Sequence, residues 1–255
     1  MFLGIDVGSQ SLKAVLLDDA LTVVGRGARA YAIAFPQPGW AEQAPALWES
    51  ALAPAVGAAL AAAGRNASDV AAVGIAGQLD GAIPVDAAGR ALGPCLIWMD
   101  RRADAALAAL RERLPPDVWR ARTGANLDGS HMAPKMRWQL DHWPAARAAA
   151  RFHQPVTYLV ERLTGVPVMD HGLASTTLAY DLQAGDFADD LLATFGLDRA
   201  LLPRLAASEA VAGLLTPAGA ELLGLPAGLP VAVGTGDDFS TPLGGGVAVP
   251  GTVAN

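Results

Sequence analysis

Three short apolar runs at the start of the chain limit the folds that it can adopt. They are Phe2–Ile5, Lys13–Leu17 and Leu21–Ala30, and glycine and aspartate residues interrupt the chain between them. Runs of this length, separated by tight polar breaks, are typical of short strands joined by turns. The sequence therefore predicts an antiparallel meander over the first thirty residues.

Helical periods and further apolar runs alternate along the rest of the chain, which indicates an α/β domain. The helical predictions are Pro45–Ala63, with a kink or break at Pro54, Asp104–Leu114, most of residues 116–165, and Asp189–Phe195. Buried strands are predicted at Val70–Ala76 and Leu229–Val233, and shorter ones at Ile83–Val85 and Cys95–Trp98. Thr176–Leu182 fits neither pattern, and the small-residue segment Ser240–Gly246 is left unassigned.

Composition narrows the class of protein. Hydrophobic residues make up 52% of the 255 residues and charged residues 17%, which is far from a disordered profile. The net charge of -7 and the lack of a basic run argue against a nucleic-acid partner. A single cysteine, Cys95, cannot form an intrachain disulfide. The amino terminus lacks the pattern of a signal peptide, and the Ala51–Ala63 stretch is shorter than a membrane span, so we expect a cytoplasmic protein without a membrane partner.

The first candidate site follows the first apolar run, in Gly4–Lys13. Asp6 ends that run, and the Gly8-Ser9 turn leaves room for backbone N–H groups to approach phosphate oxygens. A carboxylate repels phosphate, so Asp6 fits there only with Mg²⁺ between them, through water. An ordinary hairpin accounts for the same residues, because Asp and Gly are common in turns.

The second candidate site follows the last buried run, where Leu229–Val233 leads into Gly234–Asp238. Ligands of α/β sheets bind beyond the carboxyl ends of strands, and a carboxylate there can accept a proton from a hydroxyl that attacks a phosphoryl group. An aspartate that caps a helix after a turn is the alternative. A dinucleotide fingerprint does not fit, because Phe239 stands where its third glycine belongs and no helix-plus-acid pattern follows.

Two further segments carry side chains suited to a polyol. In Gly77–Gly81, Gln78 and Asp80 can hydrogen-bond hydroxyl groups, although an Asp-Gly hairpin turn explains Asp80 equally well. In Trp98–Arg102, the indole can stack on a sugar while Asp and Arg bind hydroxyls. The alternative for that segment is a buried tryptophan beside a surface ion pair. The four histidines share no spacing for a metal and are interpreted as structural or surface residues.

Taken together, these segments stand in the order typical of one family. Gly4–Ser9 resembles the phosphate-binding hairpin of the FGGY carbohydrate kinases, and Gly77–Gly81 is similar to their GQMHG or GQMDG loop. The other matching segments, in chain order, are Pro38–Gln43 followed by Pro45 and Trp48, Trp98–Arg102, Leu163–Gly165 with Asp170 and Ala174-Ser175, and Gly234–Asp237. Six matches in order are improbable by chance, so the chain resembles the amino-terminal domain of an FGGY kinase, closest to the xylulokinases.

The resemblance implies the actin-like, ribonuclease-H-like fold, with a mixed sheet flanked by helices. It implies ATP-dependent phosphorylation of a sugar or polyol, with Mg²⁺, Asp237 as general base and Asp238 as its rival. The residues that it places near the nucleotide are Asp6, which also helps to hold the metal, Gly8, Ser9, Gln10, Ser11 and Lys13. Those that it places in the sugar pocket are Gln78, Leu79, Asp80, Trp98, Asp100, Arg101 and Asp237.

Departures from the family pattern set the remaining expectations. Leu79-Asp80 stand where the xylulokinases commonly have Met-His, so we expect either D-xylulose or another ketose or polyol. Residues 1–246 are expected to form the sugar-binding domain, and residues 247–255 to begin the junction to a missing carboxy-terminal domain. The chain alone is then expected to be inactive, and a homodimer is compatible with it. The alternative from another class is a non-catalytic sugar-binding module.

Overall fold

The antiparallel meander predicted at the start of the chain is present. The computed structural model describes residues 1–113, 115–249 and 251. Strand β1 (Phe2–Val7) pairs with β2 (Ser11–Leu17), and β2 pairs with β3 (Val23–Ala30). Each strand alternates buried and more exposed side chains, so apolar residues such as Leu3 and Ile5 line one face.

The meander is one part of a larger mixed sheet. Strand β5 (Ala72–Gly77) runs parallel to β1, and β14 (Pro230–Ala232) and β15 (Thr235–Gly236) run parallel to β5. Strand β13 (Val211–Leu214) closes the edge antiparallel to β14, which gives the order β13-β14-β5-β1-β2-β3, with β15 beside β5. The predicted α/β class with a mixed sheet is confirmed, and the carboxyl ends of β1, β5 and β15 meet at one edge.

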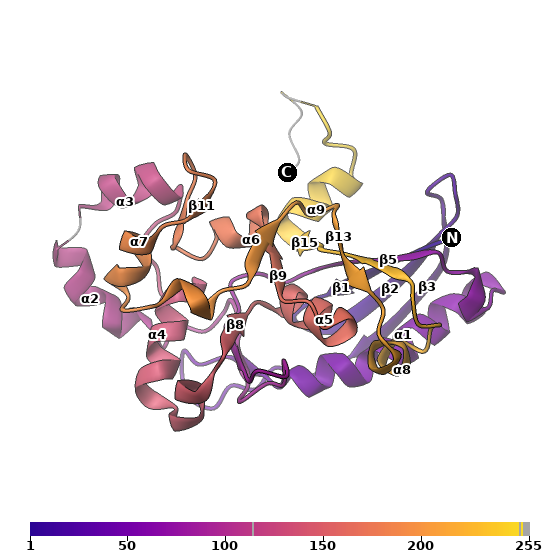
Figure 1. The fold of residues 1–255 in the computed structure, drawn as a ribbon, viewed down its shortest axis with the longest axis horizontal. Helices are drawn as coiled ribbons and strands as arrows, with labels where there is room; N and C mark the ends of the chain where they lie inside the picture. Colours follow the sequence, from indigo (N-terminus) through magenta and orange to yellow (C-terminus); the bar gives the residue numbers. More distant parts are fainter. Residues whose placement is uncertain (114, 250, 252–255) are drawn as a thin grey trace.

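One face of this sheet is covered by three helices, α1 (Pro45–Ala63), α5 (Pro155–Thr164) and α8 (Pro217–Leu223), which lie side by side below it in Figure 1. Helix α1 continues through Pro54, so the predicted break there is wrong. It lies directly on β3, where a Cβ at Gly25 or Gly27 would come within 2.2 or 2.0 Å of a carbonyl oxygen of the helix. By length and composition α1 is the one helix in the described residues that could cross a membrane, yet eight of its residues are buried against this domain.

The rest of the described chain forms a second, mainly helical region beside the sheet (Figure 1). Its helices are α2 (Asp104–Arg113), α3 (Pro116–Thr123), α4 (Met132–His142), α6 (His171–Ser175) and α7 (Asp189–Thr194). Short 3-10 helices lie at Pro144–Ala148 and Arg199–Leu201, and a third precedes β5 at Ala67–Asp69. Its strand pairs are β4 (Glu42–Gln43) with β7 (Cys95–Leu96), β6 (Ile83–Val85) with β8 (Arg151–His153), β9 (Val168–Asp170) with β12 (Arg204–Ala206), and β10 (Tyr180–Asp181) with β11 (Asp186–Phe187). Strand β8 thus interrupts the stretch predicted as mostly helical, and β10 lies in the ambiguous segment.

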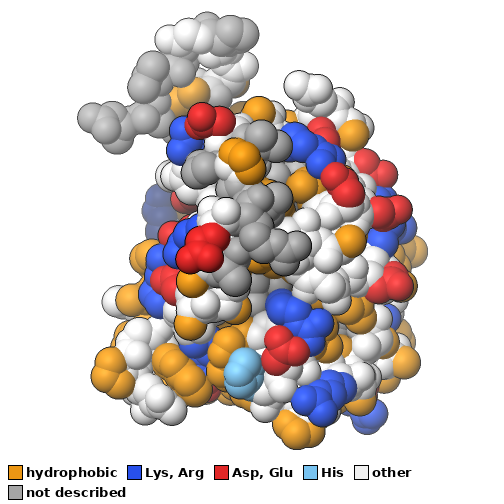
Figure 2. Space-filling view, turned by 90° about the vertical axis from the view of Figure 1, so that its left-hand side faces the viewer, with side chains coloured by type: hydrophobic (Ala, Val, Ile, Leu, Met, Phe, Trp, Pro, Cys, Tyr) orange, Lys and Arg blue, Asp and Glu red, His pale blue; other side chains and the backbone are white. Residues whose placement is uncertain are grey.

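Charges of both signs are interspersed on the end of the molecule that carries α2, α3 and α7 (Figure 2). Arg122, for example, lies between the carboxylates of Asp181 and Asp190. On this face the positive side chains are therefore matched by acids rather than gathered into a basic patch, which agrees with the acidic composition.

The unassigned small-residue segment near the end of the chain is largely helical. Helix α9 spans Asp237–Gly244 and starts directly after β15, with Gly236 as its N-cap. The alternative of a helix after the Gly234–Asp238 turn is therefore right about the helix, although Gly236 and not an aspartate is its N-cap. The element expected to begin at Thr252–Ala254 lies outside the described residues, so the proposed boundary at residue 246 stays a prediction.

Candidate functional site

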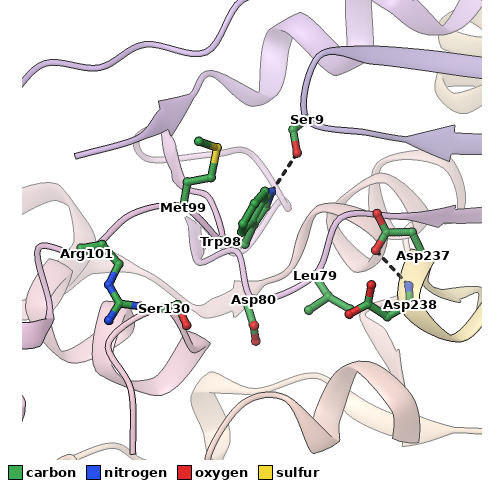
Figure 3. A pocket seen from close by; sticks show the side chains of 9 residues that line it. All are labelled: Ser9, Leu79, Asp80, Trp98, Met99, Arg101, Ser130, Asp237 and Asp238. Atoms are coloured by element: carbon green, nitrogen blue, oxygen red, sulfur yellow. Dashed lines mark hydrogen bonds between the residues drawn. The ribbon is translucent and has the colours of Figure 1, made fainter. Parts of the chain in front are cut away.

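A cavity of about 690 Å³ opens where the edge of the sheet meets the helical region (Figure 3). Its wall is built from five segments that are far apart in the sequence: the β1–β2 turn, the loop after β5, the loop after β7, Ser130 just before α4, and the start of α9. The residues that line it are Ser9, Leu79, Asp80, Trp98, Met99, Arg101, Ser130, Asp237 and Asp238. All four segments predicted from the sequence as candidate sites thus supply side chains to one cavity, and the Gly4–Lys13 segment does so through Ser9.

Asp237 reaches this cavity because the chain before it lies unusually close to β5. Gly234 has a φ of 76°, and a Cβ there would lie 2.1 Å from the carbonyl oxygen of Ile75, so only glycine fits. The hydroxyl of Thr235 donates a hydrogen bond of 2.7 Å to the buried carboxylate of Asp170. Strand β15 is therefore fixed on both sides just before it delivers Asp237.

The environment of Asp237 makes it a stronger proton acceptor than a free aspartate. Burial raises the pKa of its carboxyl, and the negative charge of Asp238 and, more weakly, that of Asp6 raise it further. The backbone N–H of Asp238 donates to Asp237 Oδ1 at 3.0 Å, which opposes the rise. A carboxylate with a raised pKa binds a proton more readily, which suits a general base.

Asp6 lies at the same edge of the sheet as Asp237. Asp6 on β1 and Thr235 on β15 stand opposite the same residue of β5, Ala76, one strand to either side of it. Neighbouring strands are about 4.8 Å apart, so the two strand-end segments are separated by only about 10 Å. Asp6 lines a neighbouring hollow with Lys13 and Thr235, whereas Asp237 lines the main cavity. The charge of Asp6 still acts on the pKa of Asp237, and one shared site for the two acids stays a prediction.

The other residues of the β1–β2 segment form the turn and the start of β2. Gly8 N–H donates to the carbonyl of Ser11, which closes the turn, and Lys13 Nζ lies 2.8 Å from Asp6 Oδ2. Ser9 lines the main cavity, whereas Gln10 lines a neighbouring hollow with Tyr31. The predicted nucleotide-binding residues thus surround one exposed turn beside the cavity.

Asp80 is held in place from several directions. Its φ of 62° is in the left-handed region, which aspartate adopts more readily than most residues but which still needs support. Its N–H donates to Gln154 Oε1 at 2.8 Å, its carbonyl accepts from Lys135 Nζ at 2.8 Å, and its Oδ1 lies 3.2 Å from His131 Nδ1. The expected alternative of a simple hairpin turn does not describe this arrangement, and the Asp80 side chain lines the cavity.

Gln78 is buried and does not line the cavity. Its amide donates to Gln43 Oε1 at 2.8 Å, and Gln43 in turn donates to the carbonyl of Ser9 at 2.7 Å. Trp98 Nε1 donates to Ser9 Oγ at 2.9 Å, while nearly half of the tryptophan surface stays exposed. The two glutamines therefore connect the β1–β2 turn to the loop after β5, and Trp98 stands over that turn as one wall (Figure 3).

Asp100 also lies away from the cavity, in contrast to its predicted place in the sugar pocket. Its fully buried carboxylate accepts hydrogen bonds from Ala41 N–H at 2.7 Å and from Arg102 Nε at 2.9 Å. Arg102 lies 2.7 Å from a carboxylate oxygen of Glu42 and packs 3.7 Å over the ring of Trp40. The Pro38–Gln43 and Trp98–Arg102 segments are thus held together, and Asp100 supports the segment that carries Trp98 and Arg101.

Arg101 lines the side of the cavity opposite Asp237 and Asp238 (Figure 3). Its guanidinium donates to Asp128 Oδ2 at 2.9 Å and to Asp104 Oδ2 at 2.8 Å, and these hydrogen bonds raise its pKa. The exposed ion pair that was the alternative for this segment is therefore present. Part of the guanidinium's hydrogen-bonding capacity is already taken by two carboxylates.

Some residues of the site were not predicted from the sequence. Met99 and Ser130 line the cavity, and His131, which had been interpreted as structural or surface, contacts Asp80. Met99 could have been found, because it lies inside the Trp98–Arg102 segment. Ser130 and His131 carried no signal, since their place depends on a contact with a residue fifty positions earlier.

The residues present fit a magnesium ion held mainly by phosphates and water. The described part of the chain has no group of three His, Cys, Asp or Glu side chains that could hold a metal by itself. Asp6 Oδ1, however, is buried without a hydrogen-bond partner among those residues. Mg²⁺ commonly uses only one or two carboxylates together with substrate phosphates, and Asp6 with this free oxygen offers one.

Comparison with known proteins gives the family. Residues 1–244 match the N-terminal domain of the FGGY family of carbohydrate kinases. The chain belongs to this family. Curated relatives of this FGGY domain include a glycerol kinase of Aromatoleum aromaticum, 37% identical over 99% of the chain and 52% of the relative, and one of Bordetella pertussis, 37% identical over 99% and 50%. The chain thus spans about half the length of the curated relatives that it matches.

Solved structures agree on the fold of this FGGY domain. A xylulose kinase from Rhodospirillum rubrum superposes with a TM-score of 0.91 and 30% identity, over 98% of this chain and 51% of that one. A glycerol kinase from Plasmodium falciparum with ADP superposes with a TM-score of 0.86 at 21% identity, over 96% of this chain and 50% of that one. The predicted actin-like architecture is confirmed, whereas the comparisons do not favour xylulose over glycerol.

Proposed function

We propose that the protein containing this domain transfers the γ-phosphoryl group of ATP to a hydroxyl of a small ketose or polyol, with Asp237 as the general base. The observation that carries the proposal is that Asp237 and Asp80 line one cavity, at the edge of the sheet where β1 also ends in Asp6. A site that only bound sugar would not need Asp6 at the end of β1, with one carboxylate oxygen buried and unpaired among the described residues. The ATP requirement fits the cytoplasmic location expected from the sequence.

In the proposed reaction the substrate lies between Asp80, Trp98 and Asp237. Asp80 accepts hydrogen bonds from substrate hydroxyls, and the exposed face of Trp98 packs against the carbon skeleton. The attacking hydroxyl oxygen forms a bond to the γ-phosphorus as the bond to the ADP oxygen breaks, and the hydroxyl proton passes to Asp237. Asp238 lies beside Asp237 and acts on its pKa.

The nucleotide side of the reaction is proposed for the β1–β2 turn. Residues 8–11 and Lys13 lie where phosphate oxygens would approach, and Asp6 would hold Mg²⁺ through water. When bound, Mg²⁺ would neutralise charge on the transferring phosphate. Because the chain spans about half of its relatives, we propose that a second domain supplies the adenosine pocket and closes over the substrate to exclude water. The 255-residue chain alone is then expected to turn over negligibly.

Two substrate classes have specific support. A ketose such as D-xylulose is supported by the structural relatives of 30% and 32% identity, which are xylulose kinases. Glycerol or another short polyol is supported by the curated relatives, which are glycerol kinases. A panel of ketoses and polyols assayed for kcat/KM on the full-length protein separates the two, because the correct substrate should exceed the other class by a factor of ten or more.

The base assignment is tested with Asp237→Asn in the full-length protein. General base catalysis contributes about 10²–10⁴-fold, so we expect kcat to fall by that factor while the affinity for the sugar stays nearly unchanged. Asp238→Asn is the matched control and should keep most of the turnover. Near-normal turnover of Asp237→Asn, or an equal loss in Asp238→Asn, would contradict the assignment.

A further inference from the structure

Lys135 on α4 is a charged side chain with no exposed surface at all. It points into the domain, and its ammonium donates hydrogen bonds to three backbone carbonyls. Nζ lies 2.8 Å from the oxygen of Asp80 and 2.8 Å from that of Ile97, and it also donates to Ser130 O. All three donor positions of the ammonium are therefore used, which is the condition under which such a group can be buried.

The three carbonyls belong to three separate segments of the cavity wall. Asp80 and Ser130 themselves line the cavity, and Ile97 directly precedes Trp98, which also lines it. These positions lie 55, 38 and 5 residues from Lys135 along the chain. One side chain thus connects, from behind, the loops that carry most of the sugar side of the cavity.

The choice of lysine at this position is informative in an arginine-rich chain. Of 18 basic residues only two, Lys13 and Lys135, are lysines. An ammonium presents three N–H donors around one point, whereas a guanidinium presents a flat fork suited to carboxylates. Three carbonyls that converge on one atom therefore require lysine rather than arginine.

We propose that Lys135 is the positioning residue of the substrate cavity: its charged ammonium holds the Asp80, Trp98 and Ser130 segments in their binding arrangement without touching the substrate. The proposal rests on the proposed function, because it takes this cavity as the sugar site. It goes beyond that function by making sugar affinity depend on a group behind the wall.

The proposal has a consequence for pH. Desolvation lowers the pKa of Lys135 to about 8, although the neighbouring Asp80, Cys95 and Asp100 raise it and Arg101 lowers it further. A pKa below the ordinary value means that the charge is present at neutral pH and is lost as the pH rises through about 8. The buried thiol of Cys95, with a pKa raised to about 12, stays neutral over this range. Sugar affinity should therefore weaken above about pH 8.

The experiment compares Lys135→Met with the wild-type full-length protein and with Arg137→Met. The control removes a positive charge from the same helix, where Arg137 pairs with Asp141 and does not contact the cavity. Hydrogen–deuterium exchange, which needs neither ligand nor turnover, should rise in Lys135→Met around residues 79–82, 97–99 and 128–131 but not in β1 and β2. The KM for the sugar should rise at least tenfold, with the KM for ATP changed less than twofold.

Two outcomes would overturn the proposal. One is a folded Lys135→Met protein whose three loops exchange like those of the wild type, or whose exchange rises equally over the whole chain. If the variant does not fold, the wild type decides: its affinity for glycerol or D-xylulose, measured by calorimetry between pH 7 and 9.5, should fall above about pH 8, and a constant affinity contradicts the proposal. The exchange result stands even if the full-length protein phosphorylates no ketose or polyol of the panel, so the failure of this proposal and that of the proposed function can be told apart.

Discussion

The two sides of the cavity are built differently. On the sugar side, Asp80 is fixed by Gln154, Lys135 and His131, and the segment carrying Trp98 is fixed through the buried Asp100. On the phosphate side, Asp6 keeps one carboxylate oxygen without a partner in the described part of the chain, and its Lys13 partner is mostly exposed. The side proposed for the sugar is thus held by contacts within this domain, whereas on the side proposed for phosphate Asp6 keeps a free oxygen among the described residues.

The largest expected effect tests how strongly the sugar side is fixed. Asp100→Ala leaves the buried guanidinium of Arg102 without its main partner, and breaking such a pair costs about 3–5 kcal/mol of unfolding free energy. Urea unfolding measures the loss, with Asp117→Ala as the control because the Asp117 side chain is 97% exposed and should be neutral. If Asp100→Ala proved as neutral as its control, the sugar side would not be the rigid one.

The next effect separates charge from backbone strain at Asp80. In Asp80→Ala we expect sugar affinity to fall about 10–100-fold, since a hydrogen bond to a charged group is worth about 1.5–3 kcal/mol. Asp80→Asn removes the charge but tolerates the left-handed backbone, so it should fold as well as the wild type and still bind weakly. Calorimetric affinities for glycerol and D-xylulose check both, and wild-type binding by Asp80→Asn would remove the carboxylate from the site.

A smaller effect is expected in the pH profile of kcat/KM when Asp238, beside Asp237, loses its charge. The charge of Asp238 helps to raise the pKa of Asp237, so Asp238→Asn lowers that pKa. Asp237 then stays ionised to lower pH, and the acid limb of the kcat/KM profile should move to lower pH. A limb that stays in place or moves upward would mean that Asp237 is not the group that titrates there.

The smallest effect is expected for the hydrogen bond between Trp98 and Ser9, which joins the two sides of the cavity. Trp98→Phe removes the hydrogen bond to Ser9, and a neutral hydrogen bond contributes about 0.5–1.5 kcal/mol, so affinity should fall about two- to tenfold. Ser9→Ala removes the same bond from the other partner. If the bond matters, the double variant should be no worse than either single variant, and fully additive losses would show that the two residues act separately.

The sequence predicted best what depends on local pattern. The strand that delivers Asp6 was visible as an apolar run that ends at an acid, and the run Leu229–Val233 predicted β14, just before the turn that leads to Asp237. Helix α1 was predicted with the bounds that it has. Strand β8 was missed because three residues inside a helical context give no period, and α9 was missed because Gly, Ser and Thr carry little helical signal.

What the sequence could not give is the partner of each polar residue. Asp100 and Gln78 were predicted to bind the sugar, yet their residue type does not tell whether they face a ligand or another loop. Lys135, Gln43 and His131 carried no motif that singled out their role, since their function arises from contacts 35 to 55 residues away. Such contacts exist only once the chain is folded.

The close fit between Leu79 and Gly236 has a practical consequence for altering the cavity. A Cβ at Gly236 would come within 2.8 Å of Leu79 Cδ2, so the sizes of these two residues are coupled behind the cavity wall that Leu79 forms. A shorter residue at position 79 would make room both for a longer substrate and for alanine at position 236. Libraries intended to change substrate preference should therefore vary the two positions as a pair.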